Sequence, residues 1–322
     1  MLPPMAIFFP MFSLLEDLGY LPRVAFNMDG IFDKCGACGK QSLTMMMGFG
    51  CNAVGVTSSR IIDSKRERLI AILTNSFVPC NGRFPMLLTL IGMLLIRRNS
   101  SILEVLILTL FVGISIFMTF FISLILSKTI LKGEKSSFTL ELPEFRRPKV
   151  TQVIVRSFKD KVIHILKRAV VVSIPAGFII WLLSNIMVSD ISIINYLVNI
   201  FDPFGKLLGM DGVILISFIL GFPANEIVIP IMSMIYMNSG VMSDGYSLVE
   251  LYNLFINNGW NIITIICASI FTLFHFPCST TVLTIYHELK SKKWTLFAFL
   301  LPTICGIVLC FFVSFILKLI FF

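Results

Sequence analysis

Four short stretches of the sequence combine cysteine, asparagine or glutamate with residues that break helices. The first, at 48–56, reads GFGCNAVGV, and a related stretch at 221–229 reads GFPANEIVI. Each is followed by a shorter one, VPCN at 78–81 and FPCS at 276–279. Thiolate, imidazole, carboxylate and amide oxygen together suit Fe²⁺ or another late divalent metal, whereas Mg²⁺ and Ca²⁺ prefer oxygen ligands. The chain therefore carries one metal-compatible pattern twice.

All four stretches lie in or beside long apolar runs, so they predict broken helices in a membrane. Irregular backbone at membrane depth must be buried in protein or line a polar cavity, and we expect the four breaks to meet near the midplane. The residues that this would bring together are Cys51, Asn52, Cys80, Asn81, Asn225, Glu226, His275, Cys278, Ser279 and Thr280. Matched breaks in two halves of a membrane chain indicate a transport site.

Each candidate also has a structural interpretation. Cysteine in a membrane segment is often a small apolar filler, and asparagine often satisfies a neighbouring backbone group. Glu226 is costly in an apolar run, which favours function, but it could pair with Arg83. His275 is either a ligand or a backbone-bonded packing residue. Glu16 and Asp17 either line a pathway or cap and anchor the end of the first apolar segment.

The composition predicts an all-α membrane fold. The 322 residues are 57% hydrophobic and only 14% charged, with a mean hydropathy of +0.92, whereas soluble domains are about a quarter charged. Runs at 102–127, 169–188 and 294–317 are long enough to span a bilayer as helices. They lack the alternation of barrel strands. We expect a polytopic helical protein with two inverted repeats.

The order of segments divides the chain into three parts. Residues 1–131 form the first repeat, 132–168 a cytoplasmic linker with a basic amphipathic interfacial helix at 150–168, and 169–322 the second repeat. Within the first repeat, 3–22 is the first apolar segment and 27–43 a polar connection.

Basic residues collect at 60–68, 128–168 and 290–293, which places these segments in the cytoplasm by the positive-inside rule. The segment 189–211, with three aspartates and one lysine, then lies outside. This arrangement requires 69–96 and 250–289 to cross the membrane and 44–60 and 212–237 to be re-entrant. The net charge of +8 is thus explained by basic cytoplasmic segments near anionic lipid headgroups. We therefore expect the lipid bilayer to be a partner of this chain, and we expect no binding of nucleic acid.

The sequence has no strong motif for nucleotide binding, disulfide formation or zinc binding. There is no GxxxxGK[ST] phosphate loop, so we expect no GTP site and no enzymatic activity in this chain. The eight cysteines lie mostly in apolar segments and do not suggest disulfides; Cys267, Cys305 and Cys310 are expected to be packing residues. Cys35 and Cys38 have zinc-like spacing, but two ligands are a weak signal.

Five motifs occur along the chain: the run Ser13–Asp29 (SLLEDLGYLPRVAFNMD), Met47–Asn52 (MGFGCN), Arg66–Leu69 (RERL), Glu141–Pro143 (ELP) and Trp294–Phe297 with Pro302-Thr303 after it. Together they closely resemble the membrane region of the ferrous iron transport protein B (FeoB) family. The resemblance covers essentially the whole chain in the right order, and the paired segments are similar to the two gate domains of that family.

This resemblance implies Fe²⁺ as the transported substrate, imported across a bacterial inner membrane. It implies metal-path roles for Cys51 and Cys80, and by extension for Glu226 and Cys278. Residues matching the family's GTP-binding domain, its coupling domain and one further span are not in this sequence. A GTPase domain or a small Feo-type accessory protein acting in trans, and a homo-oligomer, are the partners that the resemblance allows.

Two other functions remain open from the sequence. A gate-family transporter of another solute, such as a nucleoside, would use Asn52, Asn225 and Glu226 for hydrogen bonding. A non-transporting membrane scaffold would tolerate substitution of all three residues.

Overall fold

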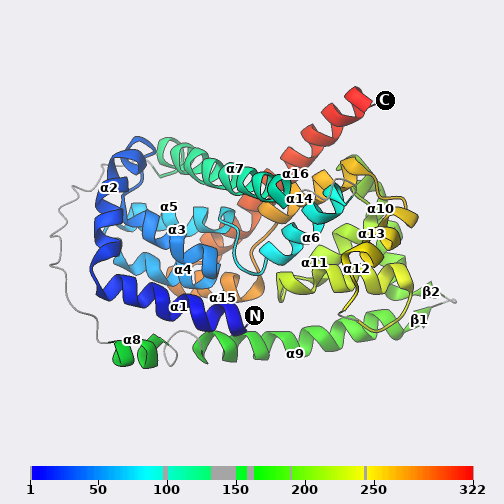
Figure 1. Ribbon diagram of the computed structural model, residues 1–322, viewed down its shortest axis with the longest axis horizontal. Helices are drawn as coiled ribbons and strands as arrows, with labels where there is room; N and C mark the ends of the chain where they lie inside the picture. The colour runs from blue at the N-terminus through cyan, green and yellow to red at the C-terminus, as the bar shows by residue number, and fades with distance from the viewer. Residues whose placement is uncertain are drawn as a thin grey trace. The chain divides into compact units, whose positions relative to one another are not determined.

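The computed structural model describes residues 2–96, 101–131, 150–157, 163–188, 191–242 and 245–321. Within them the chain is almost entirely helical (Figure 1), which confirms the all-α prediction. The first half contains α1 (Leu2–Asp17), α2 (Tyr20–Lys34), α3 (Lys40–Gly50), α4 (Asn52–Ser58), η1 (Ser59–Ile61), α5 (Lys65–Thr74), η2 (Asn75–Phe77), α6 (Phe84–Leu95) and α7 (Ser101–Lys128).

The second half follows a similar order. It contains α8 (Val150–Ser157), α9 (Ile163–Asn185), α10 (Ile193–Leu207), α11 (Gly212–Leu220), η4 (Asn225–Ile227), α12 (Val228–Met237), α13 (Leu248–Asn257), α14 (Ile262–Phe274), α15 (Ser279–Leu289) and α16 (Lys292–Phe321). Two-residue strands, β1 (Met187–Val188) and β2 (Ile191–Ser192), pair antiparallel before α10.

Among the described residues, three segments are long and apolar enough to cross a membrane. They are Ser101–Lys128, Ile262–Leu289 and Lys292–Ile320, and the pair α10–α11, bent by 112°, would make a fourth if it counts as one span. The spans expected at 102–127 and 294–317 are therefore confirmed as helices of spanning length. The segment 69–96 is not one helix, because residues 75–83 separate α5 from α6.

Two predicted segments differ from the helices of the structure. The polar connection expected at 27–43 is helical except at 35–39, because α2 buries Leu21, Ala25 and Phe32 while showing polar residues on its other side. The interfacial helix expected at 150–168 and the span expected at 169–188 are not separate helices at 168, since α9 runs from Ile163 to Asn185. The division of the chain between 168 and 169 stays a prediction. Residues 132–149 and 158–162, in the predicted linker, lie outside the described residues.

The described chain forms two compact units, each drawing on both halves of the sequence. Unit 1 contains Met1–Asn81, Val112–Ala169 and Thr280–Leu301; unit 2 contains Gly82–Phe111, Val170–Ser279 and Pro302–Phe322. Helix α6 therefore belongs to unit 2 and α15 mainly to unit 1. The division into repeats at 1–131 and 169–322 remains a proposal about the sequence.

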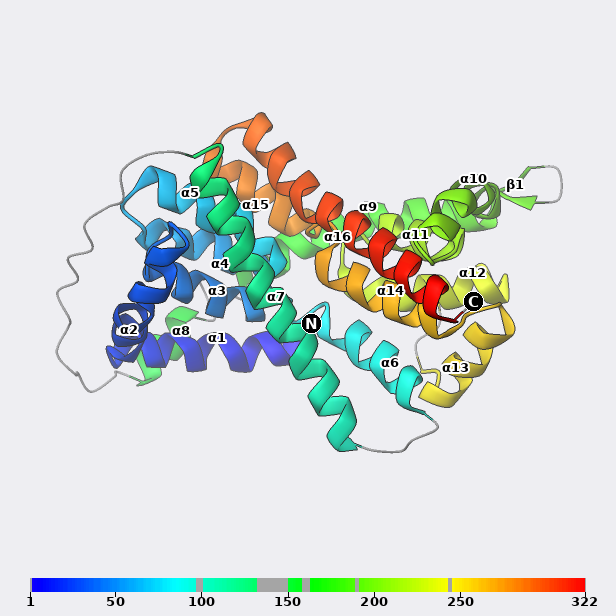
Figure 2. The same cartoon turned by 90° about the horizontal axis from the view of Figure 1, so that it is seen from above.

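In unit 1, α3, α4 and α5 lie side by side and α2 packs against α3 (Figures 1 and 2). An apolar cluster that includes Phe9, Phe12 and Met47 packs α1 against α3. In unit 2 a corresponding cluster joins α10, α11 and α12 around Ile216 and Ile231.

The two units repeat the same backbone corner. The turn after α2 contains Gly36 at φ +72°, and the turn after α10 contains Gly209 at φ +75°, a left-handed conformation that favours glycine. The N–H groups of Gly39 and Gly212 each bond the carboxylate of an aspartate ten residues earlier, at 2.7 and 3.2 Å. A Cβ at either glycine would lie within 2.3 Å of a carbonyl oxygen of the preceding helix. The internal repeat is thus conserved in local geometry.

Candidate functional site

The first pair of helix breaks lies in unit 1. Helix α3 ends at Gly50, Cys51 is extended at φ −158° and ψ 124°, and Asn52 begins α4. The second break follows α5, where η2 gives way to an extended Val78 and then to Pro79 and Cys80. An extended residue ends the helical hydrogen-bond ladder, so nearby peptide groups need other partners.

Two asparagines join these breaks. The Asn52 amide, oriented so that Nδ2 faces two carbonyl oxygens, donates to Gly48 and to Val78 at 3.2 Å each. Asn75 Nδ2 donates to the Asn52 carbonyl oxygen at 2.9 Å. Helix α7 supports the second break, because Ser115 Oγ donates to the Phe77 carbonyl oxygen at 2.5 Å. The two breaks of unit 1 are therefore held together by buried amides.

The second pair of breaks, in unit 2, has the same construction. Helix α11 ends at Leu220, Ala224 is extended at φ −153° and ψ 121°, and Asn225 begins the short helix η4. The dihedral angles of Ala224 and Cys51 agree within 5°. Helix α14 ends at Phe274, where an extended His275 begins the fourth break.

Asn225 joins the unit 2 breaks as Asn52 joins those of unit 1. Its Oδ1 lies 3.2 Å from His275 Nε2, and the Ser279 N–H donates to the Phe222 carbonyl oxygen at 2.9 Å. His275 Nδ1 lies 2.8 Å from the Thr272 carbonyl oxygen. His275 is thus buried with both ring nitrogens near protein partners, which matches its interpretation as a backbone-bonded residue.

Arg83 supports the fourth break. Its side chain is fully buried in unit 2, and the guanidinium donates to the carbonyl oxygens of Leu273 at 2.8 Å and His275 at 2.9 Å. A cation at the C-terminus of α14 satisfies orphaned carbonyl groups and the helix dipole. Its cationic charge lies close to the second half of the candidate site.

The predicted donors differ in exposure. Cys51, Glu226 and Cys278 are half-buried, Cys80 is buried, and Asn52 and Asn225 are 3% and 5% exposed. Glu16 and Asp17 lie exposed in the last turn of α1. Two of the four breaks belong to each unit, and their meeting near a midplane remains a prediction. No group of three or more His, Cys, Asp or Glu side chains is clustered for a metal among the described residues.

None of the eight cysteines forms a disulfide in the described structure. Cys267 and Cys310 are fully buried, and the Cys310 thiol lies 3.4 Å from the Cys267 carbonyl oxygen, which confirms packing roles. Burial and then the Glu67 carboxylate raise the pKa of Cys38 to about 12, and burial raises the pKa of Cys35. The burial of Cys38 favours a packing role for this residue.

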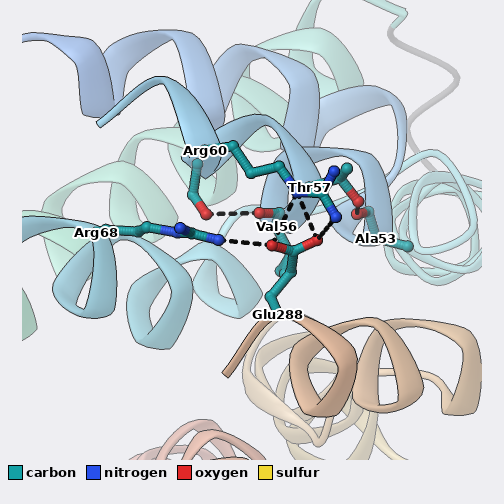
Figure 3. A network of polar contacts seen from close by, with 7 residues as sticks. Ala53, Val56, Thr57, Arg60, Arg68 and Glu288 are labelled. Atoms are coloured by element: carbon teal, nitrogen blue, oxygen red, sulfur yellow. Dashed lines mark hydrogen bonds and ion pairs between the residues drawn. The ribbon is translucent and has the colours of Figure 1, made fainter. Parts of the chain in front are cut away.

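An ion-pair network joins three segments of unit 1 (Figure 3). The Glu288 carboxylate on α15 accepts from Arg60 Nε and Nη2 and from Arg68 Nη2, with the shortest contacts at 2.6 Å. The carboxylate is only 4% exposed. Two segments that the sequence assigns to the cytoplasm, 60–68 and 290–293, are therefore close together in unit 1.

Sequence reasoning missed several buried polar residues of unit 1. Gln41 and Glu67 are 1% and 3% exposed, and Asn75 is 1% exposed. Glu67 lies between Arg66 and Arg68, so its neighbours suggested a solvated cytoplasmic segment. The available signal was helical spacing, since Glu67, Ala71 and Thr74 lie on one face of α5.

Comparison with protein families gives two matches. The Gate family profile, described as nucleoside recognition, matches residues 1–94 and 166–292, which contain all four breaks. A profile described as ferrous iron transport protein B C terminus matches residues 108–160.

Curated relatives match nearly the whole chain. The chain is 32% identical over 319 residues to a Fe(2+) transporter FeoB of Staphylococcus aureus, covering 96% of this chain and 45% of the relative. It is 28% identical over 309 residues to a Fe(2+) transporter FeoB of Synechocystis sp., covering 94% and 48%. A Fe(2+) transport protein A/Fe(2+) transporter FeoB fusion protein of Porphyromonas gingivalis is 28% identical over 343 residues, with 92% and 40% covered.

The chain spans a little less than half the length of these relatives. No solved structure matched. With its apolar spans and its paired breaks, the chain is a multi-pass helical membrane protein of the Gate family. Within that family it belongs to the ferrous iron transport protein B group and corresponds to the C-terminal membrane part of those proteins.

Proposed function

We propose that this chain forms the membrane path for Fe²⁺ uptake across a bacterial inner membrane. The observation that carries the proposal is the match of 96% of the chain to a protein named as an Fe(2+) transporter. The break pairs add support, because they hold thiols, amides and a carboxylate at interruptions of apolar helices. A borderline cation such as Fe²⁺ accepts this mixture of donors.

The proposal gives each predicted residue a role. Cys51 and Cys80 supply sulfur ligands at the unit 1 breaks, and Asn52 holds those breaks in position. In unit 2, Cys278 and Glu226 contribute sulfur and carboxylate ligands while Asn225 positions the breaks. Glu16 and Asp17 either line the approach to the path or anchor the end of α1.

The chain itself is proposed to be a conduit and not an enzyme, with no GTP site of its own. A GTPase domain or a small Feo-type protein acting in trans would then couple energy to transport. The Porphyromonas gingivalis relative supports such an accessory partner, because its name joins Fe(2+) transport protein A to FeoB in one chain. Assembly as a homo-oligomer is part of the same proposal.

Anaerobic Fe²⁺ binding to the purified protein in detergent tests the cysteine assignment. We expect near-stoichiometric binding that is lost in a Cys51→Ala/Cys80→Ala variant. A Cys35→Ala/Cys305→Ala variant is the matched control, because these half-buried cysteines lie outside the breaks and should leave binding unchanged. Equal binding in the two double variants, or none in the unmodified protein, would contradict a stable site at Cys51 and Cys80.

The second candidate function is transport of another solute such as a nucleoside, favoured by the description of the Gate family as nucleoside recognition. Substitution of Cys51 and Cys80 by serine separates the two functions. Metal uptake should collapse because a hydroxyl is a poor soft ligand, whereas nucleoside uptake should barely change. A scaffold would show no uptake of either and would tolerate substitution of Asn52, Asn225 and Glu226.

A further inference from the structure

Six side chains form a buried polar column in unit 1. The column consists of Cys38, Gln41, Glu67, Thr74, Asn75 and Ser123, drawn from the turn before α3, from the start of α3, from α5 and η2, and from α7. All six are at most 6% exposed. Polar and ionisable groups inside a membrane protein are costly and are a functional hypothesis by default.

Side-chain contacts and neighbouring positions on α5 and η2 connect the members of the column. The Cys38 thiol lies beside the Glu67 carboxylate and packs against Ala71, which follows Glu67 by one turn of α5. One turn further, Gln41 Nε2 donates to Thr74 Oγ1 at 3.0 Å and to Ser123 Oγ at 3.3 Å.

Asn75, the next residue, donates to the Asn52 backbone, where the column reaches the break that contains Cys51. Its other end, Glu67, lies within the basic segment 60–68, which the positive-inside rule assigns to the cytoplasm.

Two oxygens in this column lack hydrogen-bond partners. Gln41 Oε1 and Asn75 Oδ1 are buried without a partner in the described structure, and an unsatisfied buried acceptor is unfavourable. Space for the Asn75 oxygen depends on two glycines, since a Cβ at Gly48 or Gly55 would lie 2.8 or 2.5 Å from it. Free amide oxygens are ligands that a divalent cation accepts.

The second repeat provides an internal control. When the two repeats are aligned so that Gly48 corresponds to Gly221, Gln41 corresponds to Ile214. The Ile214 side chain is fully buried. When Cys80 is aligned with Cys278, Glu67 corresponds to Ile265 and Asn75 corresponds to Leu273. Ile265 is 3% exposed and Leu273 is 0% exposed.

Thr74 corresponds to Thr272, and both hydroxyls bond the carbonyl four residues earlier, so these two threonines share a structural role. Unit 2 thus has apolar residues in place of Gln41, Glu67 and Asn75, so the packing of that unit does not require these three polar side chains. The position of Cys38 corresponds to Asp211, whose carboxylate accepts from the Ile214 N–H and from the Tyr236 hydroxyl.

We propose that this polar column is the path by which the cation leaves the breaks of unit 1 toward the cytoplasm. The oxygens of Asn75, Gln41 and Glu67 serve in turn as transient ligands. The inference rests on the proposed transport function. It adds that the cation leaves toward the cytoplasm through unit 1 and not through unit 2.

Added cysteines test whether the column is open to water, independently of any metal. Gln41→Cys and Thr74→Cys are compared with Ile214→Cys and Thr272→Cys in proteoliposomes treated with a small cationic methanethiosulfonate. Intact-protein mass counts the adducts added to those of the native cysteines. We expect the two unit 1 positions to react at least tenfold faster than their unit 2 counterparts. Equal protection of all four positions would overturn the proposal.

Flux measurements test whether the column carries the cation. Gln41→Ile and Glu67→Ile install the residues of the second repeat, and Glu67→Gln removes only the charge. Each variant should fall at least tenfold in Fe²⁺ flux into proteoliposomes while retaining the melting temperature and the Fe²⁺ binding of the unmodified protein. Unchanged flux in these variants would reject the column and leave the proposed function intact. Absence of both binding and flux in the unmodified protein would reject the function, and the cysteine labelling would still decide whether the column is open.

Discussion

Asparagine is the residue on which both helix-break pairs depend. Asn52 and Asn225 each follow an extended residue, and each directs its side chain to the neighbouring break. An amide can do this because it both donates and accepts. The repeated sequence identified both asparagines, but their partners, Val78 and His275, are distant in the chain and became visible only in the fold.

Gly55 should be intolerant of substitution because its neighbour is a buried amide. A Cβ there would lie 2.5 Å from Asn75 Oδ1 and 2.8 Å from the Thr44 carbonyl oxygen. We expect Gly55→Ala to lower the free energy of unfolding by about 1–3 kcal/mol, the usual cost of overpacking. Thermal unfolding in detergent measures the change.

Gly113→Ala is the matched control for Gly55→Ala. Gly113 is also helical, but nothing lies within 4 Å of the position that its Cβ would take. Alanine there should stabilise the protein by about 0.4–1 kcal/mol because it restricts the unfolded chain. Equal effects of the two substitutions would show that Asn75 does not occupy the space beside Gly55.

At the scale of elements, capping side chains mark where several helices begin. Ser64 accepts from the Glu67 N–H, and Asp211 and Asn261 likewise accept from the N–H three residues later, as N-caps do. Helix α2 was missed because its polar face resembles a connection. The start of α9 was predicted too late, at 169. The change from basic to apolar residues there marks where a helix passes from water into the membrane, and a helix can continue through such a change.

The Glu288 network should hold α15 against η1 and α5. Glu288→Gln would leave Arg60 and Arg68 without their shared carboxylate, and charge-assisted hydrogen bonds contribute about 1.5–3 kcal/mol each when buried. Because Arg60 is 66% exposed, we expect a total loss of only about 1–3 kcal/mol, measured by thermal unfolding.

Asp63→Asn is the control for Glu288→Gln. It removes an ion pair with Lys40 in which the carboxylate is 87% exposed, and solvent screens such pairs almost completely. The melting temperature should therefore stay the same. A loss as large as that of Glu288→Gln would mean that burial of the carboxylate is not what makes the network stabilising.

At the scale of the whole molecule, each unit contains a helix from the other half of the sequence. The helix that follows the second break, α6, belongs to unit 2, and its counterpart after the fourth break, α15, belongs mainly to unit 1. Sequence order alone suggested two contiguous repeats. Long-range packing decides membership of a unit, because an apolar helix lies where its surface is buried best.

The predicted membrane topology can be tested with one cysteine on each of two exposed segments. Asn199 on α10 should face outside and Lys293 at the start of α16 should face the cytoplasm; both side chains are exposed. We expect an impermeant maleimide added to intact cells to label Asn199→Cys, and to label Lys293→Cys only after the cells are opened. Labelling of both from the same side would contradict the inverted arrangement of the repeats.

The sequence by itself determined the helical membrane class, two spans of bilayer length, the four breaks and the cysteines and asparagines in them. These follow from composition, helical spacing and helix-breaking residues, all of which act locally along the chain. Only the tertiary structure decided that Asn52 and Asn225 join the breaks and that Arg83 caps α14. It alone placed Gln41, Glu67 and Asn75 in one buried column. A polar side chain is assigned to water or to the interior by the helices packed around it, and that packing joins residues far apart in sequence.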